Sequence, residues 1–199
     1  MSPLDHKLLR DLWRMKGQAM AIGMVIAVGV GMLVMMTGLV TSLNETRAAY
    51  YERYRLADVF APVTRAPDRL AGRLAAIDGV RSVEARVIGG ALIDLDGIDL
   101  PVQAQAVSLP DLRNPRLNGV FLTDGRMIDR DRTDEILLLQ SFAMAHGLRP
   151  GDRIQATMNG ARRGFRIVGL AQSPEFLYTT APGELIPDDA RFGVIWMSR

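Results

Sequence analysis

The hydrophobic pattern divides the chain into one long apolar stretch near the amino terminus and a longer region of short apolar runs separated by polar turns. No charged residue occurs between Gly17 and Asn44, and a helix of that length measures about 42 Å. The hydrocarbon core of a bilayer is about 30 Å thick and requires about 20 residues. The pattern therefore predicts a transmembrane helix over residues 17–44.

The features of this stretch and its flanks predict that the helix is not cleaved off as a signal peptide, and they predict its orientation in the membrane. A cleavable signal peptide has an apolar region of about 7 to 15 residues and an A-x-A-like exit, and neither feature is present. Basic residues that flank a first membrane helix stay in the cytoplasm, and the leader carries Lys7, Arg10, Arg14 and Lys16. We therefore expect a cytoplasmic amino terminus and an extracytoplasmic remainder.

One face of the predicted membrane helix carries small residues at every fourth position. In lipid, helices associate by close packing, and Gly or Ala at this spacing lets a neighbouring backbone approach. We predict that this face packs against a partner helix. The alternative is that membrane helices are rich in Gly and Ala in any case. The predicted helix-packing residues are Ala19, Gly23, Ala27 and Gly31.

The leader, residues 1–16, has apolar residues on one side of a predicted helix and charged residues on the other. Such a helix lies flat in the cytoplasmic interface of the membrane. A straight helix from Trp13 to Tyr50 would measure about 55 Å, which exceeds the spacing of the aromatic belts, so a bend near Gly17 is expected. The alternative is a basic signal-anchor flank with no further role. The predicted membrane-interface residues are Leu8, Leu9, Leu12 and Trp13.

Residues 45–57 continue with helix-forming residues and predict a stalk helix that leaves the membrane and ends near Leu56. Tyr50 and Tyr54 are four residues apart and therefore meet on one face of a helix. We interpret these tyrosines as packing or interface residues rather than as a ligand site. The extracytoplasmic domain then occupies residues 58–199.

The first half of this domain predicts a strand over residues 58–63 and then a helix that opens near Pro67 and Asp68 and closes at Gly79. Two runs rich in β-branched residues follow, joined by an Asp96-Gly97 turn of the hairpin type. The helix residues expected to face a core are Leu70, Leu74 and Ile77.

The second half predicts a strand over residues 135–139, a short helix with Ser141 as its N-cap and Gly147 beyond its end, and a hairpin at Asn159-Gly160. The fold class is therefore α+β with antiparallel hairpins rather than a βαβ nucleotide-binding fold. The hairpin residues expected to lie on one inner face are Ile154, Ala156, Met158, Phe165 and Ile167.

Composition excludes several classes of function. The chain has no cysteine and only two histidines, far apart, so disulfides are excluded and zinc or Cys/His chemistry is not expected. No phosphate-binding glycine loop and no G-x-S-x-G sequence occurs. Residues 45–199 carry 20 charges of each sign, which argues against nucleic-acid binding. We predict no catalytic, cofactor-binding or metal-binding residue and therefore no enzyme.

Two carboxylate clusters and one arginine cluster require an interpretation. The acidic clusters do not match the calcium-loop spacing, and we interpret them as solvated turn residues. The arginines on and after the Asn-Gly hairpin fit either an acidic partner or an exposed strand face, and His146 is interpreted as a helix-end cation. The clusters comprise Asp94, Asp96 and Asp99; Asp129, Asp131, Asp134 and Glu135; and Arg162, Arg163 and Arg166.

Three segments carry a family resemblance: "KLLRDLWRMKGQAMAI" entering the membrane, "AAYYERYRLADVFA" leaving it, and "RAPDRLAGRLAAIDGV" beyond. Together with "DEILLLQSFAMAHGLRPGD" and "PDDARFGVIWMSR", they resemble the amino-terminal part of FtsX/MacB-type ABC transporter permeases. The resemblance implies a MacB-like periplasmic core, an inner-membrane location, and a periplasmic domain that is incomplete at its carboxyl end.

The resemblance also implies partners and a role. These are a separate ABC ATPase subunit, a second permease in a homodimer or heterodimer, membrane lipid and a periplasmic partner protein. ATP hydrolysis would drive export or extraction of a lipid, lipoprotein, peptide or similar substrate. Leu8, Leu9, Leu12 and Trp13 would then belong to an interfacial elbow helix. The alternative is a stand-alone, signal-anchored periplasmic adaptor with a single transmembrane helix.

Overall fold

The computed structural model describes residues 3–67, 69–95, 97–98, 101–110, 114–129, 131–181, 183 and 186–198. The chain divides into two compact units, Met1–Ala49 and Tyr50–Arg199. Each unit is described by itself.

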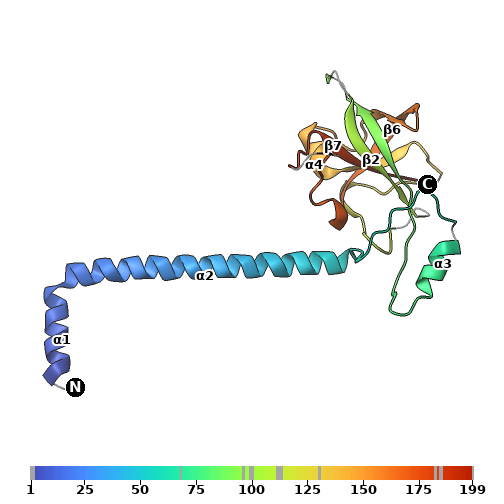
Figure 1. Ribbon diagram of the computed structural model, residues 1–199. Coiled ribbons are helices and arrows are strands. Elements are labelled where there is room, and N and C mark those ends of the chain that lie inside the picture. Colours follow the sequence, from blue (N-terminus) through green and yellow to red (C-terminus); the bar gives the residue numbers. More distant parts are fainter. Residues whose placement is uncertain are drawn as a thin grey trace. The chain divides into compact units, whose positions relative to one another are not determined.

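The first unit consists of α1 (Pro3–Arg14) and most of α2 (Lys16–Arg53). Met15 separates the two helices, close to the bend expected near Gly17, and the chain turns sharply there (Figure 1). The expected transmembrane and stalk helices form one continuous element that ends at Arg53. Its most apolar window has a mean hydropathy of 2.4 and is 0% buried, so α2 is long and apolar enough to cross a membrane.

Three threonine hydroxyls in the second half of α2 are satisfied within the helix. The hydroxyls of Thr37, Thr41 and Thr46 donate hydrogen bonds to carbonyl oxygens four residues earlier, at 2.7, 2.9 and 2.8 Å. A hydroxyl that bonds its own helix needs no water partner, which suits it to a lipid environment.

The second unit is built on one mixed sheet with short helices (Figure 1). Its elements are α3 (Arg69–Ala75), β1 (Ile88–Asp94), β2 (Val102–Leu109), β3 (Phe121–Gly125), β4 (Glu135–Leu139), α4 (Gln140–Ala145), β5 (Arg153–Met158), β6 (Ala161–Gln172), the 3-10 helix η1 (Pro174–Phe176) and β7 (Phe192–Ser198).

The seven strands described lie in the order β3-β6-β4-β7-β2-β1-β5, and β5 also pairs with β6. The sheet therefore closes on itself through six strands, with β3 added alongside β6. β6 achieves this closure because its first half pairs with β5 and its second half with β3 and β4. β2–β7 and β4–β6 are parallel pairs, which the antiparallel hairpins of the sequence did not predict.

Both predicted hairpins are confirmed. Asn159 and Gly160 have φ values of 49° and 74°, the left-handed values that a two-residue turn of this type requires, and β5 pairs antiparallel with β6 around them. β1 pairs antiparallel with β2, with Ile88 opposite Val107. In the turn between them Gly97 has a φ of 84°, whereas Asp96 lies outside the described residues.

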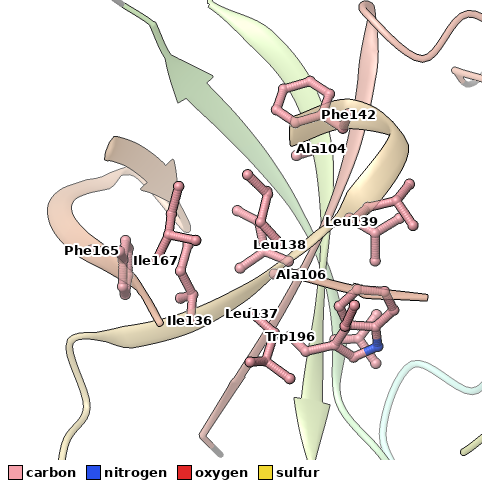
Figure 2. Packing of buried hydrophobic residues seen from close by; sticks show 14 of the residues in the cluster. Ala104, Ala106, Ile136, Leu137, Leu138, Leu139, Phe142, Phe165, Ile167 and Trp196 are labelled. Carbon is pink, nitrogen blue, oxygen red and sulfur yellow. The ribbon is translucent and has the colours of Figure 1, made fainter. Parts of the chain in front are cut away.

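The core lies on both faces of the closed sheet. All five residues of β4, between β6 and β7, are buried, and successive side chains of a strand point to opposite faces. Figure 2 shows Trp196, Phe142 and the leucines of β4 in the same cluster. The predicted inner face of the β5–β6 hairpin is confirmed: Ile154, Ala156, Phe165 and Ile167 are buried, and Met158 is half-buried.

The segment that follows α2 departs from the predictions. Residues 58–63 form no strand, and α3 is shorter than the predicted helix. Leu70 is half-buried, but Leu74 and Ile77 are exposed, so the predicted core-facing role is wrong for these two residues in the part of the chain described. An amphipathic pattern reports which face is apolar, whereas burial also requires an element that covers the face. Asp68, predicted near the start of this helix, lies outside the described residues.

The predicted N-cap of the second short helix is also wrong. α4 begins at Gln140, its N-cap position is Leu139, and no side chain caps it. β4 leads directly into α4, so no loop residue is available for capping and Ser141 falls in the first turn. Gly147 follows the helix with a φ of 67°, as predicted.

Candidate functional site

The predicted helix-packing face lies along α2. Gly23, Ala27 and Gly31 are exposed and Ala19 is half-buried. A side-chain carbon built at Gly23 or Gly31 would meet nothing within 4 Å. This face therefore has room for a partner helix, and its role in packing stays a prediction.

The predicted interface residues lie in α1. Trp13 is 72% exposed, and the Lys16 ammonium lies 5.8 Å from the centroid of its indole. This cation–π contact bridges the Met15 turn. The same helix contains Leu8, Leu9 and Leu12, whose side chains are not among those that the structure describes. The membrane-interface role of all four residues stays a prediction.

The second unit begins with an aromatic cluster, here called the entry cluster, formed by Tyr50, Tyr54 and Phe121. The centroids of Tyr50 and Tyr54 are 4.8 Å apart, as their four-residue spacing on α2 leads us to expect. Tyr54 also contacts Phe121 at the start of β3, at 5.7 Å. Both pairs are tilted, an arrangement that aromatic rings favour. No sequence pattern indicated the contact of Tyr54 with Phe121, because the two residues are 67 positions apart.

α2 ends in an unusual cap. The Leu56 amide donates to the carbonyl of Tyr51 and the Arg55 amide to that of Glu52, at 3.0 and 3.2 Å. These two bonds define a Schellman motif, whose left-handed position is usually glycine. Here the position is Arg55, with a φ of 49°. A residue with a side chain is strained in this conformation by about 1 kcal/mol or more, so other contacts must hold it.

Those contacts come from the loop that precedes β3. The Asn118 amide donates to the carbonyl of Arg55 at 2.9 Å, and the Gly119 amide to that of Tyr54 at 2.8 Å. The Asn118 side-chain oxygen accepts from the amide of Ala57 at 2.8 Å, and Asn118 is itself left-handed, with a φ of 52°. These three bonds are here called the loop clasp. They join the residues that directly follow α2 to the loop that directly precedes β3.

The acidic clusters contain one buried carboxylate. Glu135 is 2% exposed and accepts two hydrogen bonds from the Arg126 guanidinium, at 2.5 and 2.8 Å, and one from the Asp129 amide at 3.0 Å. The bond from Arg126 lowers the pKa of Glu135, opposing the effect of burial. The interpretation as a solvated turn residue is therefore wrong for Glu135, because it starts β4 inside the sheet.

The other acidic residues give no sign of a metal site. Asp94 pairs with Arg162 at 2.9 Å, whereas Asp131 and Asp134 are exposed, and Asp96 and Asp99 lie outside the described residues. Among the residues that the structure describes, no three His, Asp or Glu side chains are placed to hold a metal ion.

The arginines of the hairpin and His146 have different environments. Arg163 and Arg166 are exposed, and Arg153 lies directly opposite Arg166. The Nε2 atom of His146 lies 2.8 Å from the carbonyl oxygen of Ala190, and the imidazole contacts Phe142 at a centroid distance of 4.6 Å. His146 therefore links the end of α4 to the segment before β7 in addition to ending the helix.

The comparisons with known proteins point to one family. The family model of the MacB-like periplasmic core domain matches residues 22–197. No curated protein sequence matches the chain.

Two solved structures are similar. The periplasmic region of MacB from Actinobacillus actinomycetemcomitans has 14% identity and a TM-score of 0.40, over 68% of this chain and 56% of that chain. The extracellular domain of the noncanonic ABC-type transporter YknZ from Gram-positive bacteria has 13% identity and a TM-score of 0.39, over 73% of this chain and 70% of that chain. The chain thus spans little more than half of the MacB region.

The family match includes most of α2 and every strand of the closed sheet. It confirms the family resemblance over the membrane-exit segment and the segments beyond it, whereas the membrane-entry segment, residues 7–22, precedes all but the first residue of the match. The chain therefore belongs to the MacB-like periplasmic core domain family of FtsX/MacB-type ABC transporter permeases.

Proposed function

We propose that this chain is the amino-terminal part of a membrane permease subunit, non-catalytic itself, that couples ATP hydrolysis by a separate ATPase to movement of its periplasmic domain. The observation that carries the proposal is α2, a single helix that is apolar enough to span a membrane and whose last turn is bonded into the periplasmic domain by the loop clasp. The family assignment supports the same role.

In this proposal residues 1–16 form the cytoplasmic interfacial helix, 17–44 the membrane span, 45–57 the stalk, and 58–199 the periplasmic domain of an inner-membrane protein. Motion of α2 reaches the sheet through the entry cluster and the loop clasp, since both connect the end of α2 to β3. The moved substrate is a lipid, a lipoprotein, a peptide or a similar molecule. A periplasmic protein would be a further partner of the domain.

The small-residue face of α2 is proposed to pack against a second permease, in a homodimer or heterodimer. The test is co-purification of two differently tagged copies of the full chain from membranes. Gly23→Leu and Ala27→Leu should each abolish co-purification, because a leucine keeps the partner backbone away. Ala21→Leu is the matched control, because Ala21 lies on the opposite side of the helix and its change should have no effect.

Unchanged co-purification of both stripe variants would contradict the packing role. It would favour the alternative, a single-helix adaptor anchored in the membrane that needs no partner helix. Co-expression with a candidate ABC ATPase subunit tests the second half of the proposal, since an adaptor would not copurify with an ATPase.

A further inference from the structure

An open pocket of about 530 Å³ lies within the second unit, beside the loop clasp. Its walls come from the end of α2, from residues 114–116 and from the start of β3. Three arginines, Arg53, Arg55 and Arg116, line it together with the apolar residues Val120, Leu122 and Met127. The volume falls in the usual range for small-molecule pockets.

The charged side chains among the described residues that line the pocket are all positive. No carboxylate is among the described residues that line it, and in the described part of the chain none of the three arginines forms an ion pair. Arg53 contacts the ring of Tyr54, at 6.0 Å from its centroid. All three arginines are exposed. Guanidinium groups that line one pocket without a counter-charge are donors available to an anion, and they bind phosphate in particular through paired N–H groups.

The backbone of the pocket supports this reading independently. Arg55 occupies the left-handed cap position of α2, where glycine would be less strained. The loop clasp holds both Arg55 and Asn118 in this conformation, so the pocket is formed before any ligand arrives. Strain retained at a non-glycine residue is common at binding sites, and it indicates that the arginine side chain itself is required.

The apolar residues that line the pocket favour an amphiphile over a bare anion as its ligand. Val120 is buried, and Leu122 and Met127 are half-buried beside the guanidinium groups.

We propose that this pocket binds the phosphate head of an anionic amphiphile, with the three arginines on the phosphate and Val120, Leu122 and Met127 against the first part of its hydrocarbon chain. The proposal goes beyond the permease role and does not depend on an ATPase.

The test is calorimetric titration of the full chain, in a neutral detergent, with dihexanoyl phosphatidic acid and separately with inorganic phosphate. The double variant Arg53→Gln/Arg116→Gln should bind the lipid at least tenfold more weakly. Arg163→Gln is the matched control, because Arg163 is exposed on the β5–β6 hairpin. It should bind within twofold of the unaltered chain. Thermal unfolding of each variant verifies that the domain is folded.

A second pair of measurements separates the two sources of phosphate. Met127→Ala should weaken lipid binding at least threefold and leave the binding of inorganic phosphate unchanged. If inorganic phosphate binds as tightly as the lipid and Met127→Ala has no effect, the ligand is not an amphiphile and the proposal is overturned. Lipid binding by the folded double variant within twofold of the unaltered chain, or no detectable binding to the unaltered chain, would overturn the pocket altogether.

Discussion

The amide of Gly119 donates a hydrogen bond to the carbonyl oxygen of Tyr54, 2.8 Å away, and the approach leaves little room for a side chain. A side-chain carbon at Gly119 would lie 3.3 Å from that oxygen and 3.4 Å from the Tyr54 ring. The contact joins the residues that follow α2 to the loop before β3, and it is closest when residue 119 has no side chain.

Gly119→Ala should therefore loosen the loop clasp. We expect a loss of about 1 kcal/mol in the free energy of unfolding of the periplasmic domain, the lower end of the cost of overpacking. Denaturant unfolding of the full chain, followed by Trp196 fluorescence, measures it. Gly164→Ala is the matched control, because a side-chain carbon at Gly164 would meet nothing within 4 Å. Equal stability of the two variants would show that the contact is slack.

Arg55→Gly should change stability and ligand binding in opposite directions. Glycine relieves the left-handed strain of the cap position, so the free energy of unfolding should rise by up to about 1 kcal/mol. The same change removes a guanidinium from the pocket, so the affinity for dihexanoyl phosphatidic acid should fall several-fold. Arg55→Lys retains the strain and the charge but not the paired N–H groups, so it should leave the stability unchanged and keep more of the affinity than Arg55→Gly. If Arg55→Gly stabilises the domain and keeps full affinity for the lipid, then Arg55 serves only the cap of α2 and does not contribute to binding.

Glu135 should make the domain sensitive to acid. Its pKa is lowered in the folded state, chiefly by the hydrogen bond from Arg126. The carboxylate therefore stabilises the fold above the unfolded-state pKa, about 4.3, and this stabilisation is lost as pH falls through the lower folded-state value. Glu135→Gln should be less stable than the unaltered chain at pH 7, and the difference should shrink below about pH 4. Melting temperatures across this range measure the effect.

The matched control for Glu135 is Asp131→Asn, because Asp131 is exposed in the same acidic segment. It should leave the acid dependence of stability unchanged. An Asp131 variant that loses as much acid sensitivity as the Glu135 variant would assign the effect to the net charge of the segment rather than to the buried pair.

Local signals explain the parts of the fold that the sequence predicted. The Asn159-Gly160 hairpin was predicted from a turn dipeptide, and β4 from a run of apolar residues. Both signals are contiguous in the sequence. The parallel pairs β2–β7 and β4–β6 join segments that no turn connects, so nothing local encodes them. The prediction that Leu74 and Ile77 face a core was wrong, because burial of an apolar face depends on elements elsewhere in the chain.

The same distinction holds for the candidate site. Tyr50 and Tyr54 were identifiable because helix geometry brings residues four apart together. Their contact with Phe121 and the bond of Asn118 to Ala57 cross 60 or more residues, and only the folded sheet creates them. The left-handed cap at Arg55 has no sequence signal, because the signal for such a cap is glycine. Glu135 was misjudged because charged residues surround it in sequence, although it starts β4 inside the sheet and pairs there with Arg126.

The orientation of the chain is open to a direct test, because the sequence has no cysteine. Tyr178 is 84% exposed in the periplasmic domain and His6 is exposed in α1, so both positions accept a single cysteine as a label site. If the basic leader stays in the cytoplasm, Tyr178→Cys should react with a membrane-impermeant maleimide in intact spheroplasts. His6→Cys should react only after the membrane is permeabilised. The unaltered chain should remain unlabelled throughout and serves as the control. The reverse pattern would place the domain in the cytoplasm and would contradict the proposed permease role.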